Sequence, residues 1–205
     1  MEQFNTVTAV AVPFEESNVD TDQICPARLI RTLVGHGSDR VLFHDRRFNQ
    51  DESAKPDFIF NNPIYEGARI IVANRNFGIG SSREAAVFAV MSAGYRAIIA
   101  ESFGDIFASN CFRNGILTVR LAADALSALR GSLQRQPRAS VTIDLPKQTI
   151  IAPDGERYAF AIGALRKRCL TEGLDDLALT ERYGSEIEAF ERNYKAELPW
   201  LDMHK

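Results

Sequence analysis

Cysteine and histidine are scarce in this 205-residue sequence, with three of each. Cys25, Cys111 and Cys169 are far apart, and no two of them have C-x-x-C spacing, so the sequence predicts neither a disulfide framework nor a self-sufficient metal site. The histidines are equally scattered. We interpret His44-Asp45 as a loop histidine that is exposed or satisfied by its neighbours, in preference to a metal ligand or a catalyst. Any metal in the chemistry of this protein is therefore expected on another chain.

Basic clusters and long apolar runs are also missing. The net charge is -3 and neither sign forms a block, which excludes the basic face of a nucleic-acid-binding protein and an electrostatic membrane anchor. Residues 1–16 lack the basic start of a signal peptide and the apolar length of a membrane span. We expect a cytoplasmic protein that binds neither nucleic acid nor membranes.

The apolar residues that are present follow an alternation of strands and helices. Compact β-branched runs indicate strands, and the longer apolar runs between them indicate helices. A strand–helix–strand order implies parallel strands joined by right-handed crossovers. Strands are expected at residues 6–13, 68–74, 96–102 and 116–121, and helices at residues 83–95, 103–115 and 122–134.

The second half of the sequence changes pattern. Three short strands are predicted at residues 139–145, 148–153 and 157–162, and helices follow from Ala164. Residues 35–57 are polar and irregular, which is typical of a loop. We find no internal repeat and no linker. The sequence therefore predicts an α/β fold with a mixed sheet and βαβ units, as a single domain over residues 1–205 with a C-terminal helical tail over about 164–205.

The stretch NRNFGIGSSREAA, residues 74–86, places unusual polar chemistry at a strand-to-helix turn. A purely structural interpretation is a capping box, in which Ser81 caps the helix and the side chain of Glu84 reaches back to it. That interpretation leaves Arg83 unexplained, because a cation in the first turn of a helix is unfavourable by about 0.3–1 kcal/mol. The cation makes sense if an anion lies between it and the backbone N–H groups.

Glycines before a helix N-terminus let an anion approach the backbone closely. The sequence fits neither the dinucleotide fingerprint, because Arg83 takes the place of the third glycine, nor a phosphate loop or a nucleophile elbow. A small carboxylate is then the best candidate ligand. Ser81 has no histidine partner, but it can act as a base if backbone N–H donors and an arginine stabilise its alkoxide. Such a base suits removal of a proton beside a carboxylate, with a metal on a partner chain polarising the substrate.

Three ordered motifs resemble a known family: NVDTDQICPARLI (18–30), NFGIGSSRE (76–84) and SFGDIFASNCFRNGILTV (102–119). Together they are similar to the small subunits of 3-isopropylmalate dehydratases, the detached swivelling domain of the aconitase superfamily. The resemblance implies a three-layer β/β/α fold and a heterodimer in which a separate large subunit carries a [4Fe-4S] cluster, with no cofactor on this chain. It also implies a hydro-lyase of leucine biosynthesis that converts 2-isopropylmalate, through 2-isopropylmaleate, to 3-isopropylmalate.

The same resemblance implies roles for particular residues. The first serine of GSSRE is the carbon-acid base, and the residues beside it bind the dicarboxylate substrate and support the alkoxide. The DTD motif belongs to a loop at the subunit cleft, and PARLIRT overlaps a loop that sorts the variable side chain of the substrate. The catalytic candidates are thus Ser81 and Arg83, and the substrate-binding candidates are Gly80, Ser82, Asp20, Thr21, Asp22, Arg28 and Arg31.

Several positions depart from the usual family pattern. Ile79 replaces a cysteine, residues 85–88 read AAVF where HAPW is common, and Cys25 stands where isoleucine is frequent. Arg31 resembles the arginine that homoaconitase-type enzymes use for an additional carboxylate, although surface charge is an equally good interpretation of Arg28 and Arg31. Two alternatives remain open: a paralogous subunit acting on another substituted malate or a tricarboxylate, and a non-catalytic carboxylate-binding module.

Overall fold

The computed structural model describes residues 1–34, 40–80, 84–198 and 200. Within these residues, seven strands form one mixed sheet in the order β4-β3-β2-β1-β5-β6-β7. β1 to β4 are parallel, and β5 to β7 continue the sheet from β1 in antiparallel fashion. The strands are β1 (Thr6–Pro13), β2 (Ile70–Val72), β3 (Ala97–Ala100), β4 (Leu117–Arg120), β5 (Ser140–Asp144), β6 (Thr149–Ile151) and β7 (Arg157–Ala159). The expected mixed sheet and its βαβ units are confirmed.

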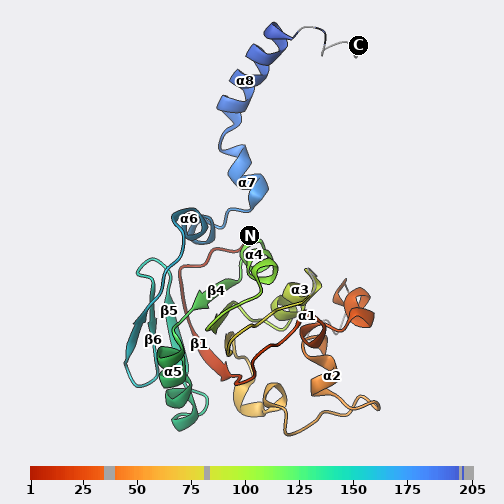
Figure 1. The fold of residues 1–205 in the computed structure, drawn as a ribbon, viewed down its shortest axis with the longest axis vertical. Coiled ribbons are helices and arrows are strands. Elements are labelled where there is room, and N and C mark those ends of the chain that lie inside the picture. Colours follow the sequence, from red (N-terminus) through yellow and green to blue (C-terminus); the bar gives the residue numbers. More distant parts are fainter. Residues whose placement is uncertain (35–39, 81–83, 199, 201–205) are drawn as a thin grey trace.

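Short helices follow β1, and longer ones follow the later parallel strands (Figure 1). The α-helices are α1 (Thr21–Ile24), α2 (His44–Arg47), α3 (Ala85–Ser92), α4 (Asp105–Arg113), α5 (Ala123–Arg135), α6 (Ala164–Glu172), α7 (Asp176–Glu181) and α8 (Gly184–Glu197). The 3-10 helices are η1 (Ala27–Val34), η3 (Ile59–Asn61) and η4 (Pro63–Tyr65). No helix in the part of the chain that the structure describes is long and apolar enough to cross a membrane.

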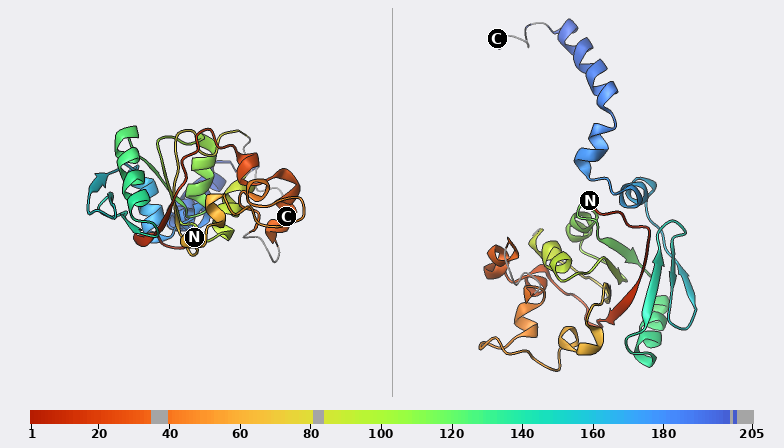
Figure 2. Two further views of the ribbon diagram at one scale, coloured as in Figure 1. Left: turned by 90° about the horizontal axis from the view of Figure 1, so that it is seen from below. Right: turned by 180° about the vertical axis from the view of Figure 1, so that it is seen from behind.

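The two faces of the parallel strands belong to two different cores. Ile71 and Ile98 point to one side and pack in a cluster that contains the buried residues of α1, α3 and α4. Their neighbours Ile70 and Ile99 point to the other side, as the two-residue period of a strand requires, and pack with the antiparallel strands and α5. Helices α1, α3 and α4 therefore cover one face of the parallel strands, and the antiparallel half of the sheet packs with α5 on the other (Figures 1 and 2). This arrangement agrees with the expected β/β/α layers.

The segment expected to be an irregular loop contributes to the core. Val41, Leu42 and Phe43 are buried, and α2 follows them directly. The Phe43 ring lies 5.2 Å from that of Phe14 and 4.7 Å from that of Phe60, measured between ring centroids. Three apolar residues between polar neighbours have no helical or strand period, so the sequence pattern did not reveal this anchor.

Helix α3 is also less enclosed than its composition indicates. Five of its residues are buried, but Phe88 and Met91 are 40% and 39% exposed. At the C-terminus, α7 and α8 leave the body of the molecule as an extended arm (Figures 1 and 2). None of the α8 residues is buried.

Candidate active site

Three chain segments meet beyond the carboxyl ends of β1, β2 and β3. The turn after β2 pairs with the segment after β3 through a bridge between Phe77 and Phe103. It pairs with the segment after β1 through a bridge between Asp20 and Ile79, where the Thr21 N–H donates to the Ile79 carbonyl at 2.9 Å. Ligands of open α/β sheets bind at this edge of the strands. All three motif segments are therefore in direct contact around the GIG turn.

The glycines of this turn are required by its backbone. Gly78 has a φ of +73°, and a Cβ atom there would lie 2.3 Å from Cγ of Phe107 on α4. Gly80 has a φ of +97°, and its Cβ would lie 3.5 Å from Cβ of Asp20 and 3.7 Å from Oγ1 of Thr21. Three of the predicted binding residues, Gly80, Asp20 and Thr21, are thus brought together. The close approach of the helix α4 ring explains why the first position of GIG accepts no side chain.

Three polar side chains that the sequence analysis did not select hold the same turn. Asn76 has a φ of +56°, a conformation that asparagine tolerates better than most residues. Its Nδ2 donates to Oδ1 of Asn18 at 2.7 Å, and its N–H donates to Oγ of Ser102 at 2.9 Å. The Ser102 hydroxyl also donates to Oδ1 of Asn76 at 3.2 Å. Each of the three follows a different parallel strand, which is the signal that could have identified them.

The DTD residues differ in their surroundings. Asp20 caps α1, because its Oδ1 accepts a hydrogen bond from the Gln23 N–H at 2.7 Å. Thr21 is buried, and Asp22 is exposed in the first turn of α1. The Asp20 carboxylate therefore stabilises the loop that borders Gly80.

Ser81, Ser82 and Arg83 lie outside the described residues, immediately before α3. The next residue, Glu84, directs its carboxylate to the end of α4, where Oε1 accepts a hydrogen bond from Nδ2 of Asn114 at 2.8 Å. This bond connects the start of α3 to the end of α4. The Ser81 half of the expected capping box stays a prediction.

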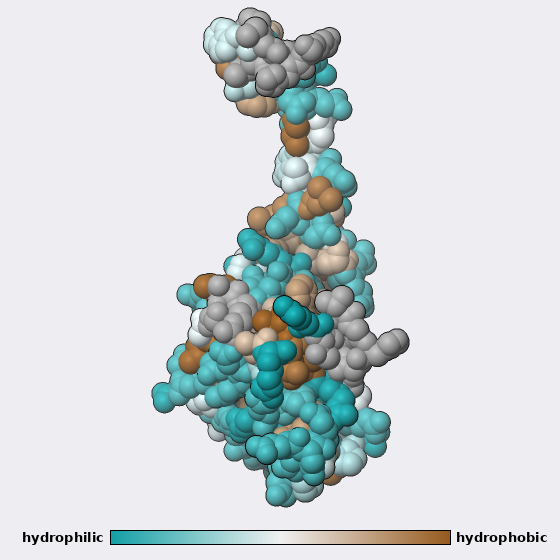
Figure 3. Space-filling view, turned by 90° about the vertical axis from the view of Figure 1, so that its right-hand side faces the viewer, coloured by the Kyte–Doolittle hydropathy of each residue, from teal (hydrophilic) through white to brown (hydrophobic). Residues whose placement is uncertain are grey.

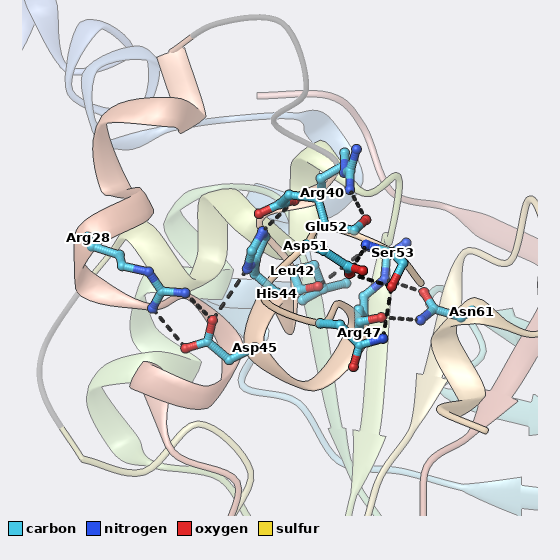
Figure 4. Close-up of polar contacts among 11 residues, drawn as sticks. Arg28, Arg40, Leu42, His44, Asp45, Arg47, Asp51, Glu52, Ser53 and Asn61 are labelled. Carbon is cyan, nitrogen blue, oxygen red and sulfur yellow. Dashed lines mark hydrogen bonds and ion pairs between the residues drawn. The ribbon is translucent and has the colours of Figure 1, made fainter. Parts of the chain in front are cut away.

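Arg28 and Arg31 lie on η1, which packs against the same apolar cluster as α3 through the partly buried Leu29. Arg28 is engaged by a carboxylate: its Nη1 donates to Oδ2 of Asp45 at 2.8 Å, and its Nη2 donates to Oδ1 (Figure 4). This hydrogen-bonded pair lowers the pKa of Asp45 to about 2 and raises that of Arg28. Arg31 is exposed.

The Arg28–Asp45 pair continues into a polar chain around His44. Nδ1 of His44 lies 3.3 Å from Asp45, and Nε2 lies 3.3 Å from Glu52, which also accepts a hydrogen bond from Arg40 at 3.1 Å (Figure 4). The His44 side chain is only 12% exposed. Both ring nitrogens of His44 therefore have acidic neighbours within the protein, which agrees with the expectation that its neighbours satisfy its hydrogen bonding.

The donor set of this chain does not fit an iron–sulfur cluster. All three cysteines are buried, and burial raises the pKa of the Cys111 thiol, whereas cluster ligation needs thiolates. In the described ranges, no group of three or more His, Cys, Asp or Glu side chains is placed to hold a metal ion.

The face seen in Figure 3 shows an apolar area with hydrophilic residues next to it. Exposed apolar side chains of η1 and α3 include Ile30, at 37% exposure, and Phe88. The candidate site thus combines hydrogen-bonding backbone at the GIG turn with apolar surface on neighbouring elements.

Comparison with known proteins gives matches over almost the whole chain. Residues 1–124 match the model of the aconitase C-terminal domain, and residues 128–164 match a model described as LeuD_N. The 3-isopropylmalate dehydratase small subunit of Azorhizobium caulinodans is 46% identical over 98% of this chain and 100% of that protein. The small subunit of Paramagnetospirillum magneticum is 45% identical with the same coverage.

A solved structure agrees with these matches. The crystal structure of a 3-isopropylmalate dehydratase from Methanocaldococcus jannaschii has a TM-score of 0.63 and 25% sequence identity to this chain, covering 90% of this chain and 99% of that one. Fold, motifs and full-length identity agree, and the chain belongs to the family of 3-isopropylmalate dehydratase small subunits in the aconitase superfamily.

Proposed function

We propose that this chain is the small subunit of a two-chain hydro-lyase. With its large subunit it isomerises 2-isopropylmalate to 3-isopropylmalate through 2-isopropylmaleate, a step of leucine biosynthesis. Full-length identity of about 45% to small subunits of this dehydratase supports the activity. The observation that carries the site is the contact of the DTD loop with the GIG turn at the carboxyl ends of the parallel strands.

In this proposal Ser81 is the base that removes the proton from the substrate carbon. Ser81 precedes Ala85, the first residue of α3, by four positions in the sequence, and the N–H groups at a helix N-terminus stabilise negative charge, which supports this role. Ser82 and Arg83 bind a substrate carboxylate, and Arg83 also stabilises the Ser81 alkoxide. We call the carboxylate site proposed at residues 80–83 the cradle; Asp20, Thr21 and Asp22 are proposed to border it, and Asp20 fixes their loop through its cap on α1.

The [4Fe-4S] cluster belongs to the large subunit in this scheme, because the buried cysteines of this chain do not supply its ligands. When bound there, the cluster acts as a Lewis acid on the substrate. The residues of this chain orient the carboxylate, hold the proton at Oγ of Ser81 and exclude water from the cleft.

Arg28 and Arg31 are proposed to face the variable part of the substrate from η1. Because Asp45 already occupies both terminal nitrogens of Arg28, Arg28 binds a further carboxylate only in competition with Asp45. Its principal effect is then to fix η1, whereas Arg31 is exposed and accessible to a ligand. The apolar Ile30 between them suits an isopropyl group.

The test is steady-state kinetics of the reconstituted pair with Ser81→Ala. Loss of the base is expected to lower kcat by about 10²–10⁴-fold, the usual contribution of proton-transfer catalysis. KM and assembly with the large subunit are expected to change little. Ser185→Ala, in the exposed first turn of α8, is the matched control and should leave kcat unchanged.

Two results would contradict the proposal. Full activity of Ser81→Ala would remove the serine from the chemistry and leave it as a helix cap. Turnover of a tricarboxylate, or of another substituted malate, without turnover of 2-isopropylmalate would reassign the substrate.

A further inference from the structure

Helix α8 carries an apolar stripe that touches no core. Large apolar side chains recur at intervals of four, three and four residues, the spacing of one helix face. These are Tyr183, Ile187, Phe190 and Tyr194, with exposed fractions of 51%, 39%, 65% and 43%. The rings of Phe190 and Tyr194 stack at 5.6 Å between centroids and 20° between planes. The arm stands clear of the body, with apolar residues on its surface (Figures 1 and 3).

The base of this arm is attached to the body by ion pairs and a helix cap. Nη1 of Arg182 lies 2.5 Å from Oε2 of Glu172, which joins the end of α7 to α6. Asp175 caps α7 and lies 3.4 Å from the N-terminal ammonium group of Met1. The start of the arm is therefore tethered to the body, while the stripe residues belong to neither of the body's cores.

A helix of this kind needs a surface to pack on. Isolated helices shorter than about 12–15 residues are marginal in water, because most helical stability in proteins comes from packing of an apolar face. Anchors at i, i+3, i+4 and i+7 are the pattern by which an amphipathic helix binds an apolar groove. We propose that α8 docks in an apolar groove on the large subunit of the dehydratase, with basic residues at the rim of that groove.

Charge at the edges of the stripe argues against a second copy as the occupant. Glu186 precedes Ile187 on one edge, and Glu191 follows Phe190 on the other. Parallel pairing of two α8 helices would place Glu186 against Glu191, and antiparallel pairing would place Glu191 against its own copy. Like charges face each other in both orientations. The cations of α8, Arg192 and Lys195, lie away from the stripe edges.

The extent of the matches to relatives supports the large subunit as the partner of the α8 stripe. The matches to small subunits of the dehydratase span 98% of this chain, so they include nearly all of the arm. The arm thus lies within the part of the chain that aligns with proteins named as 3-isopropylmalate dehydratase small subunits. The inference rests on the proposed function, which supplies the partner chain.

The experiment measures the affinity of the full-length chain for the purified, cluster-containing large subunit by isothermal titration calorimetry. The test variant is Ile187→Ala with Phe190→Ala, which removes the stripe. The control is Glu188→Ala with Arg192→Ala, which has the same number of helix-favouring substitutions on the polar side and no change in net charge. Circular dichroism of each variant checks that the body is folded.

The stripe variant is expected to raise the Kd by at least about tenfold, because truncation of buried aromatic anchors is costly at interfaces. The control is expected to stay within twofold of the wild type. At saturating large subunit, kcat for 2-isopropylmalate should be equal in all three pairs, since α8 contributes no group to the cradle.

An unchanged Kd for the stripe variant would overturn the inference. A stripe-dependent dimer of the isolated chain, detected by light scattering, would assign the stripe to a second copy and overturn it as well. Failure of the proposed function is distinguishable, because the wild-type pair would then bind through the stripe without converting 2-isopropylmalate.

Discussion

Charge pairing decides which side chains of the candidate site are accessible to a substrate. Arg28 and Arg31 look equivalent in the sequence, yet among the residues that the structure describes it is Arg28 that has an acidic neighbour, Asp45, binding both of its terminal nitrogens. The partner lies 17 residues away in a segment that shows no period. The pairing depends on tertiary contact between η1 and α2, which sequence spacing does not reveal.

The Arg28–Asp45 pair makes stability depend on pH in a defined window. The pKa of Asp45 is about 2 in the folded protein, mainly because of its hydrogen bonds with Arg28, and about 3.9 in an unfolded chain. Because the pKa of Asp45 is lower in the folded state, its ionised carboxylate stabilises the folded protein at pH values above about 4. This contribution disappears as the pH falls from about 4 to 2. Both side chains are more than half exposed, so we expect it to be below about 1 kcal/mol.

Asp45→Asn should therefore reduce the free energy of unfolding in urea by up to about 1 kcal/mol at pH 7, with the difference from wild type shrinking below pH 4. Carboxyl NMR titration of the wild type should give the low pKa directly. Asp57→Asn, on an exposed carboxylate of the neighbouring loop, is the control. A difference that stays constant between pH 4 and pH 2 would contradict the assignment.

At the scale of elements, the GIG turn depends on how closely α4 approaches it. Gly78 combines a positive φ with a site where a Cβ would lie 2.3 Å from the Phe107 ring. Gly94 has a comparable φ of +86° but has no atom within 4 Å of such a Cβ. Comparing alanine substitutions at Gly78 and Gly94 therefore distinguishes the free-energy cost of a positive φ from the cost of steric overlap with Phe107.

Gly78→Ala is expected to lower the free energy of unfolding by about 2–4 kcal/mol, of which about 1–3 kcal/mol is overpacking against Phe107. Gly94→Ala should cost only the backbone contribution, about 1 kcal/mol. Urea unfolding of both variants gives the comparison. Equal losses for the two variants would show that α4 moves away without cost.

The longer strands and helices of the body were predictable because each is an apolar run of strand or helix length between polar or glycine-containing segments. The run ARIIVAN contains β2, and the apolar run after GSSRE contains α3, with ends within a few residues of those observed. The buried triplet 41–43 was not predictable, because too few residues are present to define a period. At the site, the glycines before a helical segment were enough to identify the turn from the sequence. The contacts of Asn76 with Asn18 and Ser102 could be predicted only with knowledge of which strands are neighbours in the sheet.

At the scale of the whole molecule, the body carries the proposed substrate site and the arm carries the proposed docking surface. The body presents the GIG turn at the carboxyl ends of its parallel strands, and the arm carries an apolar stripe that belongs to neither core. In the proposed enzyme neither feature acts alone, since the described residues of this chain form no metal-binding group and the stripe is proposed to pack on the large subunit. The proposed enzyme is therefore defined at the level of two chains.

The isolated chain should consequently bind no cluster and catalyse no dehydration. Its three cysteines are buried, so anaerobic incubation with iron and sulfide is expected to leave well under one cluster per chain and no visible absorbance. Adding the cluster-containing large subunit should restore turnover of 2-isopropylmalate, with activity saturating as the small subunit is titrated in. Iron analysis and visible spectra of the separate chains, before and after mixing, are the measurements. An isolated chain that is brown and active would place the metal chemistry on this chain and refute the two-chain assignment.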